Sequence, residues 1–244
     1  TFSGGIWAGL AIPLGLAFSL FIVGRFLAEP LNRMDLITLP EFFYRRYGRW
    51  TELTVSLLTF VTFSILLAGN LAAVGWIVST ISGWSYTGSL LFAAAVIFTY
   101  TIAGGLYAAI WTDFLQLHIA ILGFLLLAGW LLFTQDWPAL LAAAPENHLN
   151  WTGLTERGNG ALLNWASIIS LALGNCMALD FMERVFAANS PSAAKRACYY
   201  AGVLCLVVGA CAAIAGLAAH QLIGDTPDTR MVLPTLVSRI LPFG

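Results

Sequence analysis

A run without a single Asp, Glu, Lys or Arg extends from Leu53 to Thr112, and it constrains this chain more than any other feature. One unbroken helix of that length would be about 90 Å long, whereas the hydrocarbon core of a bilayer is only about 30 Å thick. The run must therefore fold back on itself. Turn residues at Gly83-Trp84-Ser85 and Gly104-Gly105 are the places where it can do so. The pattern predicts two membrane spans followed by re-entry into the membrane.

Four further uncharged stretches, 1–24, 114–135, 158–179 and 197–224, are each long enough for a helix across the bilayer. Of the 244 residues, 59% are hydrophobic and 9% are charged, whereas a soluble domain carries about 25% charged residues. The apolar runs are continuous and do not alternate, which disfavours a membrane barrel. We expect an all-α polytopic membrane protein in which 1–244 is one membrane domain. Six transmembrane helices are expected, at about 3–28, 53–82, 86–104, 113–134, 161–182 and 197–222.

The loop charges predict which side of the membrane each loop occupies, because Lys and Arg concentrate in cytoplasmic loops. One side of the six-span arrangement holds Arg25, Arg33, Arg45, Arg46, Arg49, Arg184, Lys195 and Arg196. The other side holds Arg157, Arg230 and Arg239. We therefore expect segments 29–52, 105–112 and 183–196 to be cytoplasmic and both ends of the chain to be external. The expected location is the cell membrane, either a plasma membrane or a bacterial inner membrane.

Several classes of function are disfavoured by composition. The net charge is −1 and no basic tract is present, so nothing suggests nucleic acid as a partner. The four cysteines lack CxxC spacing, and His118, His148 and His220 lack neighbours at metal-ligand spacing. A membrane-embedded enzyme would need a nucleophile with a base, or a ligand cluster, and no HExxH or GxSxG pattern occurs. No catalytic residue and no resident metal or cofactor is expected.

Three motifs in the predicted cytoplasmic loops carry a family resemblance. Residues 38–48 read TLPEFFYRRYG, residues 100–116 contain YTIAGGL followed by WTDFLQ, and residues 184–197 read RVFAANSPSAAKRA. In this order they resemble the signatures of the sodium:solute symporter family. The resemblance covers essentially the whole chain.

The resemblance implies a LeuT-like architecture of two inverted five-helix repeats, with solute and sodium near the membrane midplane. The six expected helices correspond to the second through seventh core helices, so this chain would be a fragment without the first and eighth. The implied function is sodium-coupled symport of a small organic solute by alternating access, with Na⁺ as the coupling ion. An alternative is a symporter-like membrane sensor domain fused to a histidine kinase. Coupling to protons in place of sodium stays open.

Polar residues within the expected spans are candidates for facing the solute. They are Asn70, Asn164, Ser167 and Asn175. Hydrocarbon penalises such groups unless they are paired, so an interhelical hydrogen bond is the alternative role for each. The resemblance implies that the helix over 161–182 is broken near the midplane, and Gly174-Asn175 is the expected break. Close helix packing at Gly174 is the alternative.

Charged residues at the inner end of the same helix are candidates for a cytoplasmic gate. They are Asp180, Glu183 and Arg184. Glu183 departs from the family pattern, in which Gln commonly precedes the arginine. Residues 180 and 183 share a helix face, and ion pairing with Arg184 or Arg196 is one expected role. Solvation at the membrane interface is the other.

Asp113 is the expected cation-pathway residue, because the resemblance assigns that role to the aspartate of the WTD motif. It is the only acidic residue between Glu52 and Asp136. The alternative is a helix cap, because Asp113 is expected where a span begins and Asp at a helix start is favourable. A carboxylate near the inner membrane boundary is costly unless it is paired or used by an ion.

The predicted topology can be tested by cysteine accessibility. With native cysteines removed, a cysteine replacing Ser192 should be protected in intact cells from a membrane-impermeant thiol reagent. A cysteine replacing Thr155 should react, because residues 135–160 are expected outside. The reverse labelling pattern would invert the orientation of every span.

Overall fold

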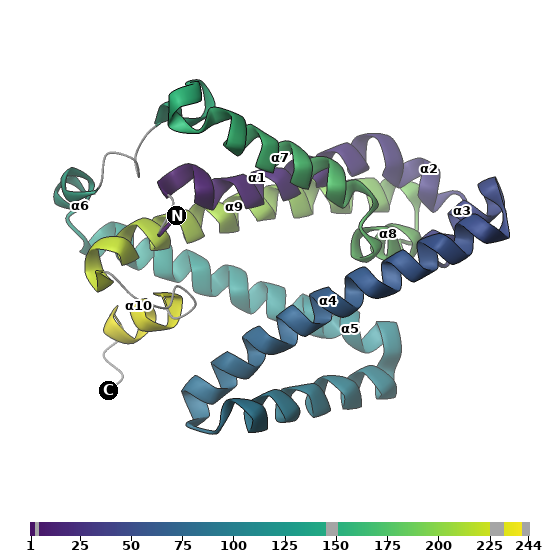
Figure 1. Ribbon diagram of the computed structural model, residues 1–244, viewed down its shortest axis with the longest axis horizontal. Helices are drawn as coiled ribbons and strands as arrows, with labels where there is room; N and C mark the ends of the chain where they lie inside the picture. The colour runs from purple at the N-terminus through teal and green to yellow at the C-terminus, as the bar shows by residue number, and fades with distance from the viewer. Residues whose placement is uncertain (3–4, 145–150, 225–231, 241–244) are drawn as a thin grey trace. The chain divides into compact units, whose positions relative to one another are not determined.

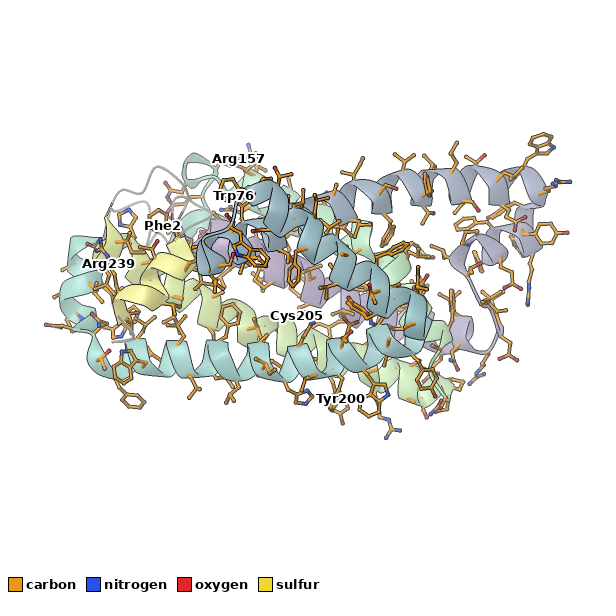
Figure 2. All side chains as sticks on the ribbon, turned by 90° about the horizontal axis from the view of Figure 1, so that it is seen from below. Phe2, Trp76, Arg157, Tyr200, Cys205 and Arg239 are labelled. Atoms are coloured by element: carbon orange, nitrogen blue, oxygen red, sulfur yellow. The ribbon has the colours of Figure 1, made fainter. Side chains whose placement is uncertain are left out.

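The computed structural model describes residues 1–2, 5–144, 151–224 and 232–240. These residues form helices and contain no strand (Figure 1). Five helices are long and apolar enough to cross a membrane, and a bent pair of shorter helices brings the number to six. This confirms the expectation of an all-α polytopic membrane protein. Side chains project along the whole length of the spans (Figure 2), and many large apolar ones, such as Leu58 and Leu126, remain exposed.

The chain divides into two compact units, Thr1–Ile37 with Ile121–Gly244, and Thr38–Ala120. In the first unit, helix α1 (Gly5–Ile22) lies along helix α9 (Pro191–Ile223) and against helix α7 (Ala161–Gly174) (Figure 1). Close approach depends on small residues. A Cβ at Gly209 would collide with the Pro13 ring, and one at Gly202 would collide with Phe21. Small residues serve the same purpose in membrane helix pairs generally.

The first span changes helix type before it ends. After α1 the chain forms a π-helical turn, η1 (Val23–Leu27), and then helix α2 (Ala28–Asn32). The whole span therefore runs from Gly5 to Asn32, beyond the expected end at residue 28. Short π-helical segments within α-helices are rare and occur often at functional sites.

The fifth span is broken, as the sequence predicted. Helix α7 ends at Gly174, a 3₁₀ turn η5 (Asn175–Met177) follows, and helix α8 (Leu179–Phe186) continues at an angle of 44°. Ala178 has extended backbone, with ψ at 132°. The break expected at Gly174-Asn175 is therefore present and is completed at Ala178.

Several short helices belong to the first unit in addition to its spans. Asp136 caps helix α6 (Trp137–Ala143), and two 3₁₀ turns, η3 (Trp151–Leu154) and η4 (Arg157–Asn159), precede α7. Helix α10 (Val232–Ile240) packs on α9. The buried cluster here contains Leu131, Ala215, Ala218, Ala219, Val232 and Leu236. Hydropathy alone does not predict α6 or α10, because both are far too short to span a bilayer.

The second unit contains helix α3 (Leu39–Tyr47), helix α4 (Arg49–Ser82) and the part of helix α5 (Tyr86–Thr134) that precedes Ile121. The TLPEF motif, expected as a loop, starts α3, with Thr38 before the helix and Pro40 in its first turn. Proline is tolerated there because that N–H has no helical partner. Gly83, at φ +71°, ends α4. Gly75 then allows α4 to approach Leu90 of α5.

Gly105 divides α5 into the spans Tyr86–Gly105 and Tyr107–Thr134. Its φ of +52° and ψ of −140° are not helical, and only glycine adopts such angles without strain. The second of these spans begins at Tyr107 and not at 113, so its first turns contain residues expected in a loop.

Replacing Gly105 by Ala should destabilise the full-length protein by about 1–3 kcal/mol, because the new Cβ would force a strained backbone conformation. No atom within 4 Å would contact that Cβ, so the cost is conformational and not steric. Gly123→Ala is the matched control, because Gly123 is helical and its surroundings are equally open. It should be neutral or stabilising by up to about 1 kcal/mol. Thermal unfolding in detergent measures both, and equal shifts would contradict the assignment.

Candidate functional site

The break in the fifth span borders a cavity of about 460 Å³ within the first unit. Its walls come from α1, from the η5–α8 segment and from the first half of α9. Three lining residues are strongly polar, Asn175, Asp180 and Arg184, and all three are candidates from the sequence. The other lining residues are Leu16, Leu20, Phe181, Val185, Ala194, Ala197, Cys198, Ala201 and Cys205.

Asn175 lies where helix α7 stops. Its Nδ2 donates a hydrogen bond of 2.9 Å to the carbonyl of Leu171. That carbonyl also accepts the backbone N–H of Asn175, so the side-chain amide adds a second hydrogen bond at the end of α7. Asn175 therefore combines a structural role at the break with a position on the cavity wall.

Asp180 and Arg184 lie one helical turn apart on α8. Asp180 is in the first turn of α8, where the helix dipole favours negative charge. The Nη1 atom of Arg184 donates a 2.8 Å hydrogen bond to the backbone carbonyl of Asp180. Asp180 forms no ion pair with another described residue. One cavity wall thus presents a carboxylate and a guanidinium.

The remaining candidates of the first unit lie away from this cavity. Asn164 donates from Nδ2 to the carbonyl of Gly153 at 2.8 Å, which ties α7 to the preceding turn. Ser167 donates from Oγ to the carbonyl of Leu163 at 2.9 Å. Glu183 is half-buried and forms no ion pair within the described part of the chain.

Asn70 and Asp113 belong to the second unit, on α4 and α5. Both are exposed in this chain. Asp113 lies six residues after Tyr107, where its span begins, so it is not at the helix start as the sequence analysis supposed. A capping residue precedes the first turn, and the helix dipole fades within that turn. The capping alternative therefore does not fit Asp113.

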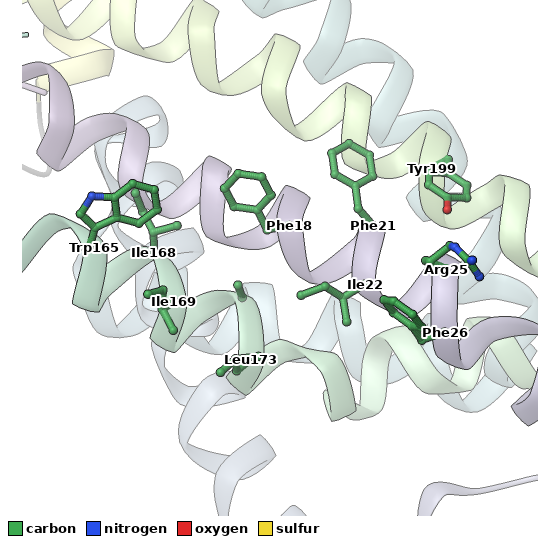
Figure 3. Close-up of a pocket in the computed structure, with 11 residues that line it drawn as sticks. Phe18, Phe21, Ile22, Arg25, Phe26, Trp165, Ile168, Ile169, Leu173 and Tyr199 are labelled. Atoms are coloured by element: carbon green, nitrogen blue, oxygen red, sulfur yellow. The ribbon is translucent and has the colours of Figure 1, made fainter. Parts of the chain in front are cut away.

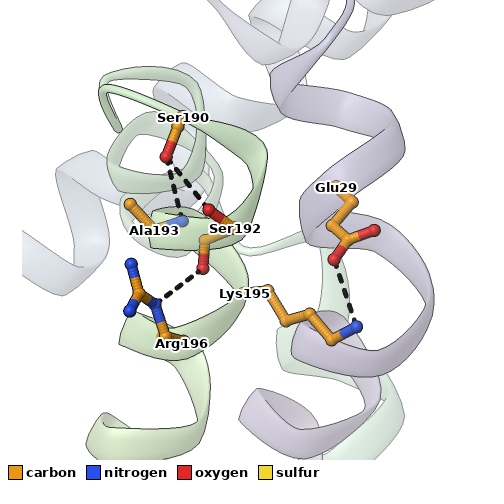
Figure 4. A network of polar contacts seen from close by, with 6 residues as sticks. All are labelled: Glu29, Ser190, Ser192, Ala193, Lys195 and Arg196. Atoms are coloured by element: carbon orange, nitrogen blue, oxygen red, sulfur yellow. Dashed lines mark hydrogen bonds and ion pairs between the residues drawn. The ribbon is translucent and has the colours of Figure 1, made fainter.

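The third motif builds the junction between α8, α9 and α2 (Figure 4). Ser190 precedes α9, and its Oγ accepts a 3.2 Å hydrogen bond from the Ala193 N–H. Arg196 Nε donates to the carbonyl of Ser192 at 3.4 Å. Lys195 Nζ lies 3.1 Å from Glu29 Oε1, an ion pair that joins α9 to α2. These contacts begin a helix and fix its position.

Asn32 is the residue at this junction that the sequence analysis missed. It is buried at the end of α2, and its Nδ2 donates to the carbonyls of Val185 and Ala188, both at 2.9 Å. Val185 is in the last turn of α8 and its carbonyl also accepts the Ala188 N–H, whereas Ala188 lies just beyond the helix. A single Asn in a stretch expected to be a loop gives no signal of a partner more than 150 residues away.

The fold and the broken span define a class: polytopic α-helical membrane proteins in which polar side chains line a cavity at a helix break. The model of the sodium:solute symporter family matches residues 2–242, so the chain belongs to that family.

Curated relatives agree with this assignment. The sodium/glucose cotransporter of Vibrio parahaemolyticus is 27% identical over 93% of this chain and 44% of its own length. The high affinity choline transporter 1 of Homo sapiens is 24% identical over 94% of the chain and 42% of its own length. The sodium/proline symporter of Haemophilus influenzae is 27% identical over 49% of the chain and 25% of its own length. The chain spans less than half the length of these relatives.

Replacing Asn32 by Leu should destabilise the full-length protein by about 1–3 kcal/mol, because the buried Val185 carbonyl and the partly buried Ala188 carbonyl would each lose the hydrogen bond from Asn32. Asn70→Leu is the matched control, since Asn70 is exposed and substitutions at such positions usually change stability by less than about 0.5 kcal/mol. Thermal unfolding in detergent separates the two. A junction role for Asn32 is refuted by equal unfolding temperatures of the two variants.

Proposed function

We propose that the full-length protein is a secondary active transporter that couples sodium entry to uptake of a small organic solute by alternating access. Family membership supports the sodium coupling and argues against an enzyme. The relatives are named for glucose, choline and proline, so the family alone does not fix the solute. Sodium is the proposed coupling ion, and no other cofactor is proposed.

The observation that carries this proposal is the broken span beside the cavity. At membrane depth, non-helical backbone is tolerated only where it is buried in protein or lines a water-filled cavity. A solute crossing the membrane needs such a cavity together with groups that can bind it. Asn175, Asp180 and Arg184 supply an amide, a carboxylate and a guanidinium on its wall.

Two interruptions of regular α-helix give the first unit places to bend. The π-helical turn η1 lies between α1 and α2, and η5 lies between α7 and α8. Alternating access requires one part of a transporter to rock or gate against another. We assign η1 and η5 this bending role. In the same proposal Asp180, Glu183 and Arg184 belong to the inner gate, while Asn70, Asn164 and Ser167 face the solute pathway in other states of the cycle.

Sodium-driven uptake tests the proposal directly. The purified full-length protein in liposomes, given an inward sodium gradient, should accumulate one solute among labelled sugars, amino acids, quaternary amines and carboxylates. An equal potassium gradient should not support accumulation. If no solute in these classes is taken up and radioactive sodium does not bind, the proposed function is wrong.

Asp113 is proposed as a cation-pathway residue. It is an exposed carboxylate in the second turn of a membrane span, and acidic residues within membrane spans commonly mark ion pathways. The alternative of helix capping does not fit its position. Carboxylate oxygens are suitable ligands for a hard cation such as Na⁺.

Asp113→Asn should weaken the apparent affinity for sodium roughly tenfold, about 1.4 kcal/mol, with normal expression. The reason is the loss of negative charge at nearly constant shape. Asp136→Asn is the matched control, because Asp136 caps α6 and Asn caps a helix nearly as well. Equilibrium binding of radioactive sodium to the purified full-length protein measures both. Wild-type affinity in Asp113→Asn would assign Asp113 a structural role only.

A further inference from the structure

A second hollow in the first unit is a groove of about 460 Å³ between α1, η1 and α7, with Tyr199 of α9 at one end (Figure 3). We call it the aromatic groove. It lies on a different face of α1 from the cavity, because Leu16 and Leu20 line the cavity whereas Phe18 and Ile22 line the groove. Among its residues, only Arg25 and Phe26 belong to a segment used in the proposed transport function, the turn η1.

The aromatic groove is apolar along its length. Its floor includes Ile168, which is 2% exposed, while Leu173 and Phe26 at its edges are 62% and 63% exposed. The cavity instead has an amide, a carboxylate and a guanidinium among the apolar residues of its wall. In a bilayer, a surface of large exposed hydrocarbon side chains is suited to contact with acyl chains.

The part of the groove beside Arg25 matches one leaflet of a bilayer in length. On the first span it extends from Phe18 to Phe26. The α7 part, from Trp165 to Leu173, continues the groove beyond Phe18, because Ile168 and Leu171 lie level with Gly15. Each of these intervals is about 12 Å long in a helix. Half of a hydrocarbon core is about 15 Å thick. A single acyl chain with its phosphate at Arg25 therefore fits along the Phe18–Phe26 part of the groove within one leaflet.

Arg25 supplies the one charge among the residues that line the groove. Its guanidinium lies 5.3 Å from the centre of the Phe26 ring, and it lies at the same end as the hydroxyl of Tyr199 (Figure 3). Both Arg25 and Phe26 belong to the π-helical turn. A guanidinium is the side chain best suited to bind a phosphate with parallel hydrogen bonds.

We propose that the aromatic groove binds an anionic phospholipid, with one acyl chain along the groove and the phosphate on Arg25. The charge of the lipid complements Arg25, and the apolar walls complement its chain. The loop charges predict that Arg25 is near the cytoplasmic surface, where anionic lipids attract basic residues. Because the groove abuts η1, a bound lipid would also contact one of the two places where the unit can bend.

Native mass spectrometry of the full-length protein tests this proposal. The purified protein is exposed to equal amounts of phosphatidylglycerol and phosphatidylcholine with identical chains. Wild type should retain severalfold more phosphatidylglycerol. Arg25→Gln should abolish that preference, whereas Arg33→Gln should keep it, because Arg33 is exposed at the end of α2 and outside the groove.

A second variant tests the acyl chain separately. Leu173→Trp fills the groove with a larger apolar side chain, so it should reduce retention of both lipids at unchanged expression. The proposal is overturned if Arg25→Gln and Arg33→Gln change the lipid ratio equally, which would indicate a general effect of surface charge. It is also overturned if Leu173→Trp retains lipid like wild type, or if it shifts the mass from an oligomer to a monomer. That last result would show that a second copy covers the groove.

Discussion

The structure depends on the satisfaction of backbone hydrogen bonds in a medium without water. A helix within a bilayer can stop only where side chains or neighbouring elements replace the lost hydrogen bonds. At the break in the fifth span, the Leu171 carbonyl accepts the Asn175 N–H, and the Asn175 side chain adds a second hydrogen bond to it. At the junction of α2 and α8, Asn32 donates to the Val185 carbonyl and to the Ala188 carbonyl just beyond α8. Asn175 therefore supports the end of α7 as well as lining the cavity.

The two interrupted spans of the first unit pack against each other on both sides of their interruptions. Helix α1 packs against α7, and α2 packs against α8. Helices α1 and α7 precede the interruptions η1 and η5, and helices α2 and α8 follow them. The contact between α2 and α8 is short, but it contains two hydrogen bonds from the buried side chain of Asn32 to backbone carbonyls. Bending at one interruption would thus displace its partner helix as well. This coupling gives a physical reason for a π-helical turn in an otherwise regular span.

Charge and hydropathy were sufficient to predict the class and the approximate number of spans, because these features are local and depend on runs of one kind of residue. The break at Gly174-Asn175 was implied by the family resemblance. The start of the fourth span was misplaced. Trp111-Thr112-Asp113 is polar enough to suggest a loop, but Gly105 alone reverses the chain, and the helix resumes at Tyr107. The role of Asn32 could not be predicted, because its partners are distant in sequence and appear only when α2 lies against α8. Of the candidate site residues, three that lie at or just after the break line the cavity. Asn164 and Ser167 instead donate hydrogen bonds to backbone carbonyls.

The three family motifs correspond to elements that shape the backbone. Thr38 and Pro40 start α3, Gly105 reverses the chain between two spans, and Ser190 starts α9. Each of these roles is independent of the solute. This explains in physical terms how relatives named for glucose, choline and proline can share one family model with this chain. Under the proposed transport function, residues that select a solute must instead lie where the helices leave space. Asp180 lies on such a wall, outside the third motif, and together with Arg184 it leaves that wall without net charge.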